Sequence, residues 1–415
     1  MRSSVTWCWI CVERLSRLLT AIVLFLVAPC AKFAITRSTG KLPITIPIVV
    51  ADNLVYMQGR INDSRPLSVV LDTGSSLSIV TPAVAEEIGL HPSGSAQAAG
   101  IGHGSNQTLQ FVNDAHLQWG AGHSVAALDG QRIAILPIGY VASQVGRPTD
   151  AFFGSNVFKN SCVTVDYEGQ HATFASPDAP PAVKESVPLK ILSDAPFVTA
   201  VLESPDGSRV NGLFMLDSGT TGALILNKQF LSAHPQIISG RTLLEMPSIT
   251  AVGGKIDQKV VRVAGLDLGV FHFSQLVAVV LESNTGMFAN PAIAGFIGAE
   301  VMRRFTITWD YTHERMLLAP NSHLHDAFEA DSSGLRLTVS PPDYKTIHVA
   351  AVLPSSPAAE AGLRVGDVIT AINGKSNVQL WRVVEDLKKP DTSASLTIRR
   401  GNKFIRVAVH LRRLV

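Results

Sequence analysis

Asp72-Thr73-Gly74-Ser75 and Asp217-Ser218-Gly219-Thr220 are the two stretches of this sequence that decide its fold. Each follows an apolar run, Val69-Val70-Leu71 in the first case and Phe214-Met215-Leu216 in the second. An aspartate that leaves a buried strand into a glycine turn, between hydroxyl residues, predicts a carboxylate held rigidly at the floor of a cleft. The two copies are well separated along the chain, at positions 72 and 217, which predicts two facing halves.

A single Asp-Thr/Ser-Gly string is weak evidence, because an ordinary strand-to-turn corner uses the same residues. The sequence downstream of each copy strengthens the prediction. Phe152-Phe153-Gly154 follows Asp72 at almost the same spacing as Phe296-Ile297-Gly298 follows Asp217. Matched spacings of this kind indicate an internal repeat.

Further landmarks repeat in the same order. Upstream of the two aspartates, residues 55–61 and 198–202 both have the composition of strands and end in polar turns. Downstream, two more strands end in Val165-Asp166-Tyr167 and Trp309-Asp310-Tyr311. One unit of about 140 residues is therefore present twice.

These motifs resemble those of the retropepsin-like and pepsin-like aspartic peptidases, with both lobes in one chain, over residues 45–320. The resemblance implies a mainly β fold, in which two closed β-barrel-like lobes are related by a pseudo-twofold axis. It implies that Asp72 and Asp217 form the catalytic dyad and that Gly154 and Gly298 pack behind the aspartate loops. It also implies bracing of the two loops by side chains that bond across to the opposite lobe. The residues that would support the dyad are Thr73, Gly74, Ser75, Ser218, Gly219 and Thr220, with Thr73 and Ser218 as the bracing pair.

Two glycine-rich segments between apolar strands, residues 100–104 and 252–254, have the composition of mobile hairpin tips. By the resemblance they match the flaps that close over a peptidase cleft, although no tyrosine is present at either tip. The flap residues expected on this basis are Gly100, Ile101, Gly102, Val252, Gly253 and Gly254.

Paired carboxylates suit the hydrolysis of amides without a covalent intermediate. Two carboxylates in close contact cannot both ionise, so they share one proton, as the aspartic peptidases illustrate. The ionised member accepts a proton from water while its partner donates to the carbonyl oxygen. Ser75 and Thr220, three positions after each aspartate, are placed to donate to the carboxylates and favour an acidic working range. The opposing interpretation is an inactive protein that keeps the scaffold.

Composition limits the remaining classes of function. The chain has 415 residues, enough for two or three domains, and a net charge of +2, which gives no electrostatic basis for binding nucleic acid. Three of the four cysteines lie near the N-terminus, at Cys8, Cys11 and Cys30, so no disulfide is expected in the body of the protein. The fourth, Cys162, precedes an apolar strand and is expected to be a small buried side chain.

The N-terminal segment, residues 1–39, has the pattern of a signal peptide or membrane anchor. Arg14 and Arg17 precede an apolar run from Leu18 to Ala31, which is shorter than the ~20 residues of a comfortable membrane span. We therefore expect export to the periplasm or cell envelope, with the protein attached to a membrane only if this segment stays uncleaved.

A proline-rich link, residues 176–181, and a polar stretch, residues 321–333, divide the remaining chain. The expected domains are an N-terminal lobe (40–182), a C-terminal lobe (183–322) and a third module (333–415).

The third module resembles a PDZ domain, a small α/β fold. The motifs that carry the resemblance are Ser356-Pro357-Ala358-Ala359-Glu360-Ala361-Gly362-Leu363, Gly366-Asp367-Val368-Ile369 and Ile372-Asn373-Gly374-Lys375. PDZ domains bind extended chain ends beside one of their strands. The resemblance implies a peptide-binding strand and loop at Gly334, Leu335, Arg336 and Leu337, and a groove helix over residues 378–387. A purely structural module that packs on the lobes is the alternative.

Two histidine patterns point to no separate chemistry. His323-Leu324-His325-Asp326 lies in a linker without a second ligand set, so we expect a surface segment and no metal site. His103 could suggest a serine peptidase, a class that PDZ domains often accompany. The sequence contains no nucleophile elbow and no matching order of acid residues, and the doubled aspartate turn decides against that class.

The sequence therefore predicts an aspartic endopeptidase that needs no cofactor, acts on polypeptides and carries a module for a peptide or C-terminal ligand. The rival hypothesis is a catalytically inactive, exported peptide-binding or scaffold protein.

Overall fold

The structure is a computed structural model that describes residues 42–98, 107–179, 181, 185–251 and 254–415. The segment expected to be a signal peptide or anchor lies outside these residues. Within the described ranges, none of the helices combines the length and apolar character needed to cross a membrane.

The N-terminal lobe is a closed barrel. Its sheet runs in the order β2-β3-β4-β9-β5-β8-β7-β6, and an additional pairing between β3 and β7 closes six of these strands into a ring. The strands are β2 (Val49–Ala51), β3 (Leu54–Ile61), β4 (Leu67–Leu71), β5 (Ser78–Val80), β6 (Gly94–Ala98), β7 (Gln107–Ala121), β8 (Ser124–Ile135) and β9 (Ala151–Phe153). Three short helices accompany them: α1 (Pro82–Glu87), α2 (Tyr140–Val145) and α3 (Ser155–Asn160).

The C-terminal lobe repeats this topology, except that the strands equivalent to β7 and β8 are each divided into two. Where the first lobe has the long strand β7, this lobe has two successive strands, of which β18 pairs with β21 and β19 pairs with β14. β18 and β19, which follow each other closely in the chain, together take the place of that one strand. The strands are β13 (Lys190–Leu192), β14 (Ala195–Glu203), β15 (Arg209–Asp217), β16 (Leu224–Asn227), β17 (Leu244–Ala251), β18 (Gly254–Arg262), β19 (Gly265–Leu268), β20 (Phe271–Ser274), β21 (Val277–Leu281) and β22 (Ile293–Gly298). The helical segments are α4 (Lys228–Ala233), η1 (Pro235–Ile238), η2 (Gly286–Ala289) and α5 (Ala299–Met302).

A shared sheet joins the lobes in the order β1-β11-β10-β23-β24-β12, three strands from each half. At its centre Thr164 pairs with Thr308, and their hydroxyl oxygens lie 2.8 Å apart. These two residues are equivalent in the sequence repeat, so the pseudo-twofold axis passes between them. The strands are β1 (Ile44–Pro47), β10 (Cys162–Asp166), β11 (His171–Ala175), β12 (Glu185–Pro188), β23 (Phe305–Asp310) and β24 (Arg315–Pro320).

Apolar packing is continuous across the two lobes. Alternating side chains of the barrels and the shared sheet form one core, which includes the buried indoles of Trp119 and Trp309. Cys162 is a free, buried cysteine at the start of β10, as expected. Burial raises the pKa of its thiol to about 12, so this side chain packs as a small apolar group.

The third module has its own core and sheet, in the order β25-β26-β27-β29-β30 with β28 beside β27. Ser356 caps α6, and Asn373-Gly374 forms the hairpin turn after β27. Its elements are β25 (Leu335–Thr338), β26 (Ile347–Val352), β27 (Val368–Ile372), β28 (Lys375–Ser376), β29 (Ser393–Arg400), β30 (Lys403–His410), α6 (Pro357–Glu360) and α7 (Leu380–Leu387).

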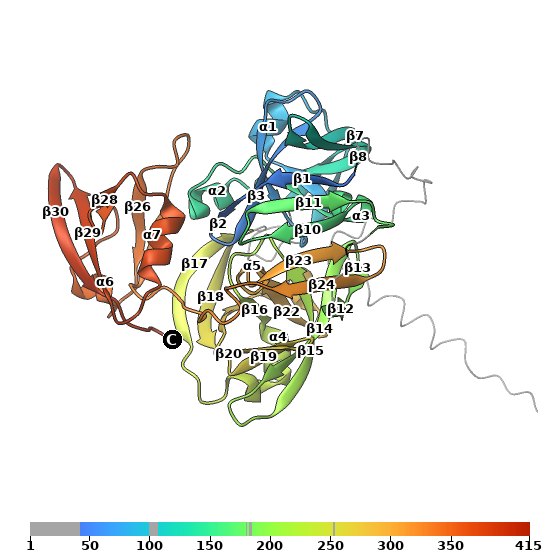
Figure 1. Ribbon diagram of the computed structural model, residues 1–415. Coiled ribbons are helices and arrows are strands. Elements are labelled where there is room, and N and C mark those ends of the chain that lie inside the picture. The colour runs from blue at the N-terminus through green and yellow to red at the C-terminus, as the bar shows by residue number, and fades with distance from the viewer. Residues whose placement is uncertain (1–41, 99–106, 180, 182–184, 252–253) are drawn as a thin grey trace, which may run out of the picture.

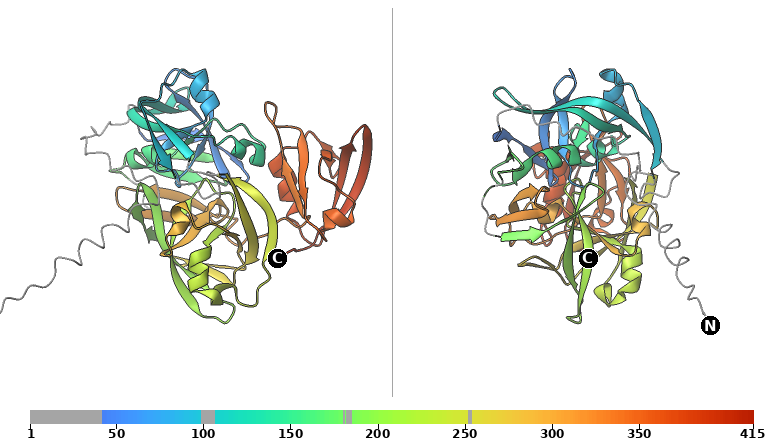
Figure 2. Two further views of the ribbon diagram at one scale, coloured as in Figure 1. Left: turned by 180° about the vertical axis from the view of Figure 1, so that it is seen from behind. Right: turned by 90° about the vertical axis from the view of Figure 1, so that its right-hand side faces the viewer.

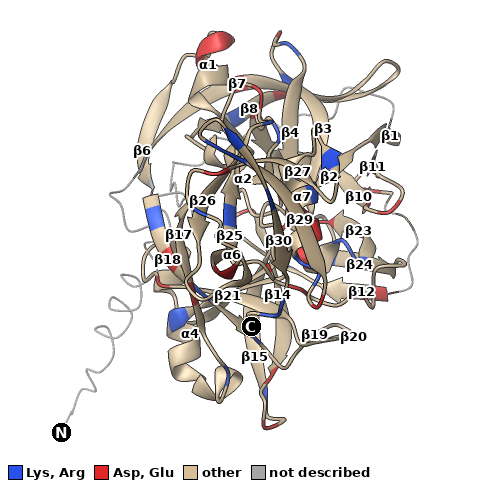
Figure 3. Cartoon of the chain, turned by 90° about the vertical axis from the view of Figure 1, so that its left-hand side faces the viewer, with Lys and Arg blue, Asp and Glu red and all other residues tan. Residues whose placement is uncertain are grey.

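The third module docks on both lobes. In Figure 1 it lies beside α2 of the first lobe and β17 of the second, and the opposite view in Figure 2 shows the same arrangement. The side that faces the viewer in Figure 3, which includes this module, carries basic and acidic positions interspersed. The mainly β fold with two closed lobes and a small third module is confirmed.

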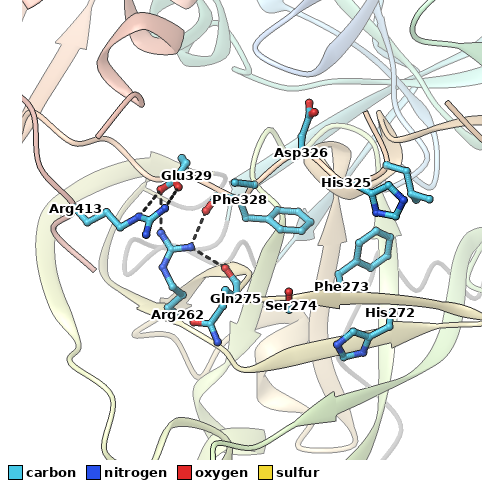
Figure 4. A pocket seen from close by; sticks show the side chains of 12 residues that line it. Arg262, His272, Phe273, Ser274, Gln275, His325, Asp326, Phe328, Glu329 and Arg413 are labelled. Carbon is cyan, nitrogen blue, oxygen red and sulfur yellow. Dashed lines mark hydrogen bonds and ion pairs between the residues drawn. The ribbon is translucent and has the colours of Figure 1, made fainter. Parts of the chain in front are cut away.

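An ion-pair cluster fixes the linker between the second lobe and the third module. Glu329 of the linker accepts hydrogen bonds from Arg262 of β18 and from Arg413 near the end of the chain (Figure 4). Arg262 also donates to the carbonyl oxygens of Phe328 (2.7 Å) and Gln275 (2.8 Å). One carboxylate thus joins three parts of the chain that are far apart in sequence.

Candidate active site

Each of the two predicted aspartates stands at the end of a barrel strand. Asp72 follows β4, and its N–H donates to the carbonyl oxygen of Phe153 on the parallel neighbour β9 (3.0 Å). Asp217 ends β15 in register with Gly298 on the parallel neighbour β22. The apolar runs before each aspartate are buried between barrel strands, so the two turns are held from behind.

Four hydrogen bonds tie the two aspartate loops together across the lobe interface. The N–H of Thr73 donates to the Ser218 hydroxyl (2.9 Å), and the N–H of Ser218 donates to the Thr73 hydroxyl (3.0 Å). Each hydroxyl then donates to a carbonyl oxygen of the opposite lobe, Leu216 (2.8 Å) and Leu71 (2.9 Å) respectively. All four bonds are buried, so they fix one loop against the other. This is the cross-lobe bracing that the resemblance implied.

The two carboxyl groups have matching surroundings. Asp72 accepts from the N–H of Gly74 (2.8 Å) and the hydroxyl of Ser75 (2.6 Å). Asp217 accepts from the N–H of its own Gly219 (2.9 Å) and the hydroxyl of Thr220 (2.7 Å). The sequence predicted both hydroxyl donors.

Glycine is needed in both loops because each carboxyl group lies against the opposite loop. A Cβ added at Gly74 would lie 2.6 Å from the Oδ1 of Asp217, and one added at Gly219 would lie 2.7 Å from the Cγ of Asp72. Real Cβ atoms do not tolerate such distances. The two carboxyl groups are therefore brought together at the lobe interface, where they interact directly.

Burial dominates the electrostatics of the pair. It raises the pKa of Asp72, and the bonds from Ser75 and Gly74 oppose that rise only in part. For Asp217, burial and then the neighbouring charge of Asp72 raise the pKa to about 7. The expectation that the hydroxyl donors would set an acidic working range is therefore incomplete, because desolvation outweighs them. The pair therefore keeps its shared proton to higher pH than exposed aspartates would.

In each repeat, the glycine of the apolar-apolar-glycine string packs against the aspartate loop. A Cβ at Gly154 would lie 2.4 Å from the carbonyl oxygen of Ser75, and one at Gly298 would lie 2.2 Å from that of Gly222. Both glycines thus pack against the loop that follows the aspartate, as the resemblance implied. Neither position leaves room for a side chain.

A cleft of about 610 Å³ opens above the pair. Its walls are mainly apolar and come from both lobes, from α2, β5 and β8 on one side and from β16, β21, β22 and η2 on the other. Representative lining residues are Ile79, Leu136, Val141, Ile225, Val279 and Phe296. Such a cleft suits an extended chain with apolar side chains on both sides of the two carboxyl groups.

The expected flap tips fall mostly outside the described residues: this applies to Gly100, Ile101, Gly102, Val252 and Gly253. Gly254 opens β18 with a φ of 108°, a conformation that favours glycine. The hairpins that carry the tips are described, since β6 pairs with β7 and β17 pairs with β18. Ile249 and Thr250 of β17 line the cleft.

The PDZ residues expected to bind peptide divide into two kinds. Leu335 and Leu337 are buried in the core of the module, whereas Arg336 between them lines the cleft. Gly334 adopts a φ of 79°, and its N–H donates to the carboxylate of Asp331 (2.5 Å). The carboxylate of Asp331 therefore already occupies a backbone donor of the loop that the resemblance implies for peptide binding.

The third module contributes to the cleft, which the sequence did not predict. Lys388, directly after α7, lines the same cleft as Asp72 and Asp217, as does Arg336. No sequence motif predicts that these two side chains line the cleft, because their position depends on how the module docks on the lobes. Only a match between the surface of α2 and the surface of the module could have revealed it.

The remaining candidate positions add no second site. Across the residues that the structure describes, no three His, Cys, Asp or Glu side chains are grouped so that they could hold a metal ion. His323 instead pairs with Asp326, which also binds Arg303. His103 lies outside the described residues.

Comparison with known families identifies two regions. Residues 57–147 match a family model described as aspartyl protease, and residues 348–400 match one described as PDZ domain. A 62-residue stretch is 44% identical to the protein named serine protease HTRA1 in Xenopus tropicalis and in Xenopus laevis. That stretch covers 15% of this chain but only 14% and 13% of those two proteins.

Solved structures of both kinds are similar to parts of the chain. An aspartic proteinase from Irpex lacteus is 15% identical with a TM-score of 0.40, covering 68% of this chain and 99% of its own. The HtrA3 PDZ domain bound to a phage-derived ligand is 26% identical with a TM-score of 0.17, covering 19% of this chain and 81% of its own. The family-model matches confirm the resemblance drawn from the motifs: the chain carries an aspartyl protease region followed by a PDZ domain.

Proposed function

We propose that this protein is an aspartic endopeptidase in which Asp72 and Asp217 act as one catalytic pair. The observation that carries the proposal is the pairing of two buried carboxyl groups from opposite lobes, each pressed against the glycine of the other loop. An unpaired surface aspartate in a turn would have none of these features. The apolar cleft above the pair supports a polypeptide substrate.

The chemistry follows from the shared proton. With one carboxyl ionised and its neighbour protonated, the carboxylate accepts a proton from a bound water as the water oxygen attacks the peptide carbonyl carbon. The protonated partner donates to the carbonyl oxygen, which gives a neutral tetrahedral diol. As the diol collapses, one of its hydroxyls returns a proton to the ionised aspartate, the C–N bond breaks, and the protonated aspartate donates its proton to the leaving nitrogen. The two aspartates titrate as a unit, so neither has a fixed role.

The direct test is cleavage of a proteome-derived peptide mixture by the wild type, D72N and D217N, read out by mass spectrometry across about pH 3 to 8. Both asparagine variants should lose cleavage, because each removes one partner of the proton exchange. D63N is the matched control, since Asp63 is exposed in the turn after β3. Absence of cleavage by the folded wild type at every pH would favour the rival function, a peptide-binding scaffold.

We also propose that the PDZ domain assists substrate binding and that the protein is exported. The docking of the module beside the cleft supports the first proposal, and the apolar run from Leu18 to Ala31 behind two arginines supports the second. Cell fractionation with sequencing of the mature N-terminus tests export. Recovery in the cytoplasmic fraction with an intact leader would contradict it.

A further inference from the structure

The PDZ domain forms part of the wall of the dyad cleft. Arg336 of β25 and Lys388 after α7 line the same continuous space as Asp72 and Asp217. They are the two basic side chains that the described residues contribute to this wall. A substrate that extends from the dyad along the cleft therefore passes two basic side chains supplied by a different domain.

Helix α2 fixes this part of the PDZ domain relative to the dyad. The carbonyl oxygen of Ser143 on α2 accepts from the N–H of Val339 (3.0 Å) and the hydroxyl of Thr338 (3.1 Å), at the end of β25. Gly146 packs so closely on α7 that an added Cβ would lie 2.5 Å from the Cβ of Leu380. Because α2 also lines the cleft, Arg336 is held close to an anchored strand end.

Arg336 differs from the other charged groups of the wall. Burial raises the pKa values of Glu300 and Glu385, and Lys388 is close enough to both for its positive charge to oppose that rise. The negative charge of Asp52 acts on the same two glutamates in the opposite direction to Lys388. Glu329 is bound by arginines of the linker cluster described above. Arg336 is half-buried, and no carboxylate among the described residues pairs with it.

An uncompensated guanidinium beside a substrate cleft has a definite chemical preference. Burial lowers the pKa of Arg336, and no neighbouring acid within the described part of the chain opposes that effect. A planar guanidinium binds a carboxylate with two parallel hydrogen bonds, which makes arginine suited to recognise aspartate or glutamate side chains. A substrate carboxylate bound to Arg336 would offset the cost of removing the guanidinium from water.

We propose that Arg336 is a specificity-determining residue that binds an acidic side chain of the polypeptide substrate, at one position to one side of the bond that is cut. This proposal rests on the proposed peptidase function and deepens it. The PDZ domain thus acts on substrate choice through a side chain of its first strand, which lines the same cleft as the dyad.

The test is a peptide series with one cleavable core, in which a single glutamate is moved through the flanking positions. Each peptide has a partner with glutamine at the same place, and kcat/KM is measured near pH 5.5, where glutamate is ionised. For the wild type we expect one position at which glutamate is preferred over glutamine by about tenfold or more, the scale of a hydrogen bond to a charged group.

Substitutions then assign that preference to Arg336. In R336Q the ratio between the glutamate and glutamine peptides should fall to near one, and in R336E a lysine peptide should become the better substrate at the same position. A reversed preference cannot arise from partial unfolding. R406Q is the matched control, because Arg406 is exposed on β30, at the opposite edge of the PDZ sheet from β25. It should keep the wild-type ratio.

The outcomes separate this inference from the function on which it rests. If the wild type cleaves peptides without preferring glutamate at any position, or if R336Q keeps the preference, the role of Arg336 is wrong and the peptidase function stands. If the folded wild type cleaves none of the peptides, both proposals fail.

Discussion

Asp72 and Asp217 each accept two hydrogen bonds that favour the charged form, yet both have raised pKa values. The donors could be predicted from the sequence, because Ser75 and Thr220 follow their aspartates at a fixed spacing. Their net effect could not be predicted. Desolvation depends on the whole lobe interface that encloses the pair, which no local motif describes.

The raised pKa of Asp217 has a consequence for stability. Between about pH 4 and pH 7 the folded protein keeps a proton that the unfolded chain has released, so its free energy of unfolding falls as the pH rises. D217N, which has no such group, should therefore melt a few degrees above the wild type near pH 8. The difference should shrink toward pH 4. Thermal unfolding at several pH values measures it, and a difference independent of pH would contradict the assignment.

The hydroxyl of Thr73 is expected to matter for stability more than its size suggests. In T73V the buried N–H of Ser218 and carbonyl oxygen of Leu216 lose a partner, which should cost about 2–4 kcal/mol of unfolding free energy. T45V is the control, because Thr45 is exposed and its hydroxyl oxygen lies 2.8 Å from that of Thr173, which is also exposed to solvent at this bond. It should cost less than about 1 kcal/mol. Urea unfolding distinguishes the two, and equal losses would argue against the cross-lobe bracing.

At the scale of elements, the internal repeat could be predicted because each copy has an aspartate turn followed by an apolar-apolar-glycine string at nearly the same spacing. The strands that carry Asp72 and Asp217, and the strands that pair behind them, followed from apolar runs bounded by turns. The division of one long strand into β18 and β19 in the second lobe was not predicted. Residues 263 and 264 separate β18 from β19, whereas the equivalent β7 continues unbroken through its pairings with β8 and β3, and no turn motif in the sequence marks this difference.

The glycines behind the aspartate loops give a prediction at this scale. G154A should displace the Ser75 carbonyl and with it the Asp72 loop, because the new methyl group overlaps backbone that cannot move freely. We expect at least a tenfold loss of kcat/KM for a peptide substrate together with a lower melting temperature. The control G139A has open space at its Cβ and an ordinary helical φ of −60°, so it should be neutral. Equal behaviour of the two variants would contradict this account.

For the whole molecule, the domains could be predicted from the sequence, but the way in which they pack against one another could not. Two lobes and a PDZ domain could be predicted from motifs. The docking of the PDZ domain could not, since it rests on contacts such as those of Ser143 and Gly146 that have no sequence signature. The linker after residue 320, expected to be a polar spacer, instead buries Phe328 beneath Arg304.

Glu329 is the residue through which this assembly can be tested. E329Q should leave Arg262 and Arg413 without a carboxylate and loosen the PDZ domain from the second lobe. We expect faster release of the domain in limited proteolysis, through cleavage within residues 321–333. E360Q is the control, because the Glu360 pair with Arg412 is exposed to solvent and lies within the PDZ domain, so its loss should leave the proteolysis unchanged. Unchanged proteolysis of E329Q would mean that other contacts hold the domain.

The central claim is that two carboxyl groups, one from each half of the molecule, act together on one substrate. The most direct measurement is the binding of a statine-type inhibitor, whose hydroxyl mimics the transition state, to the wild type, D72N and D217N near pH 5 by calorimetry. The wild type should bind it tightly, and each asparagine variant should bind at least about a hundredfold more weakly, because the hydroxyl needs both partners. Equal affinity in all three proteins, or no binding to the wild type, would contradict the account.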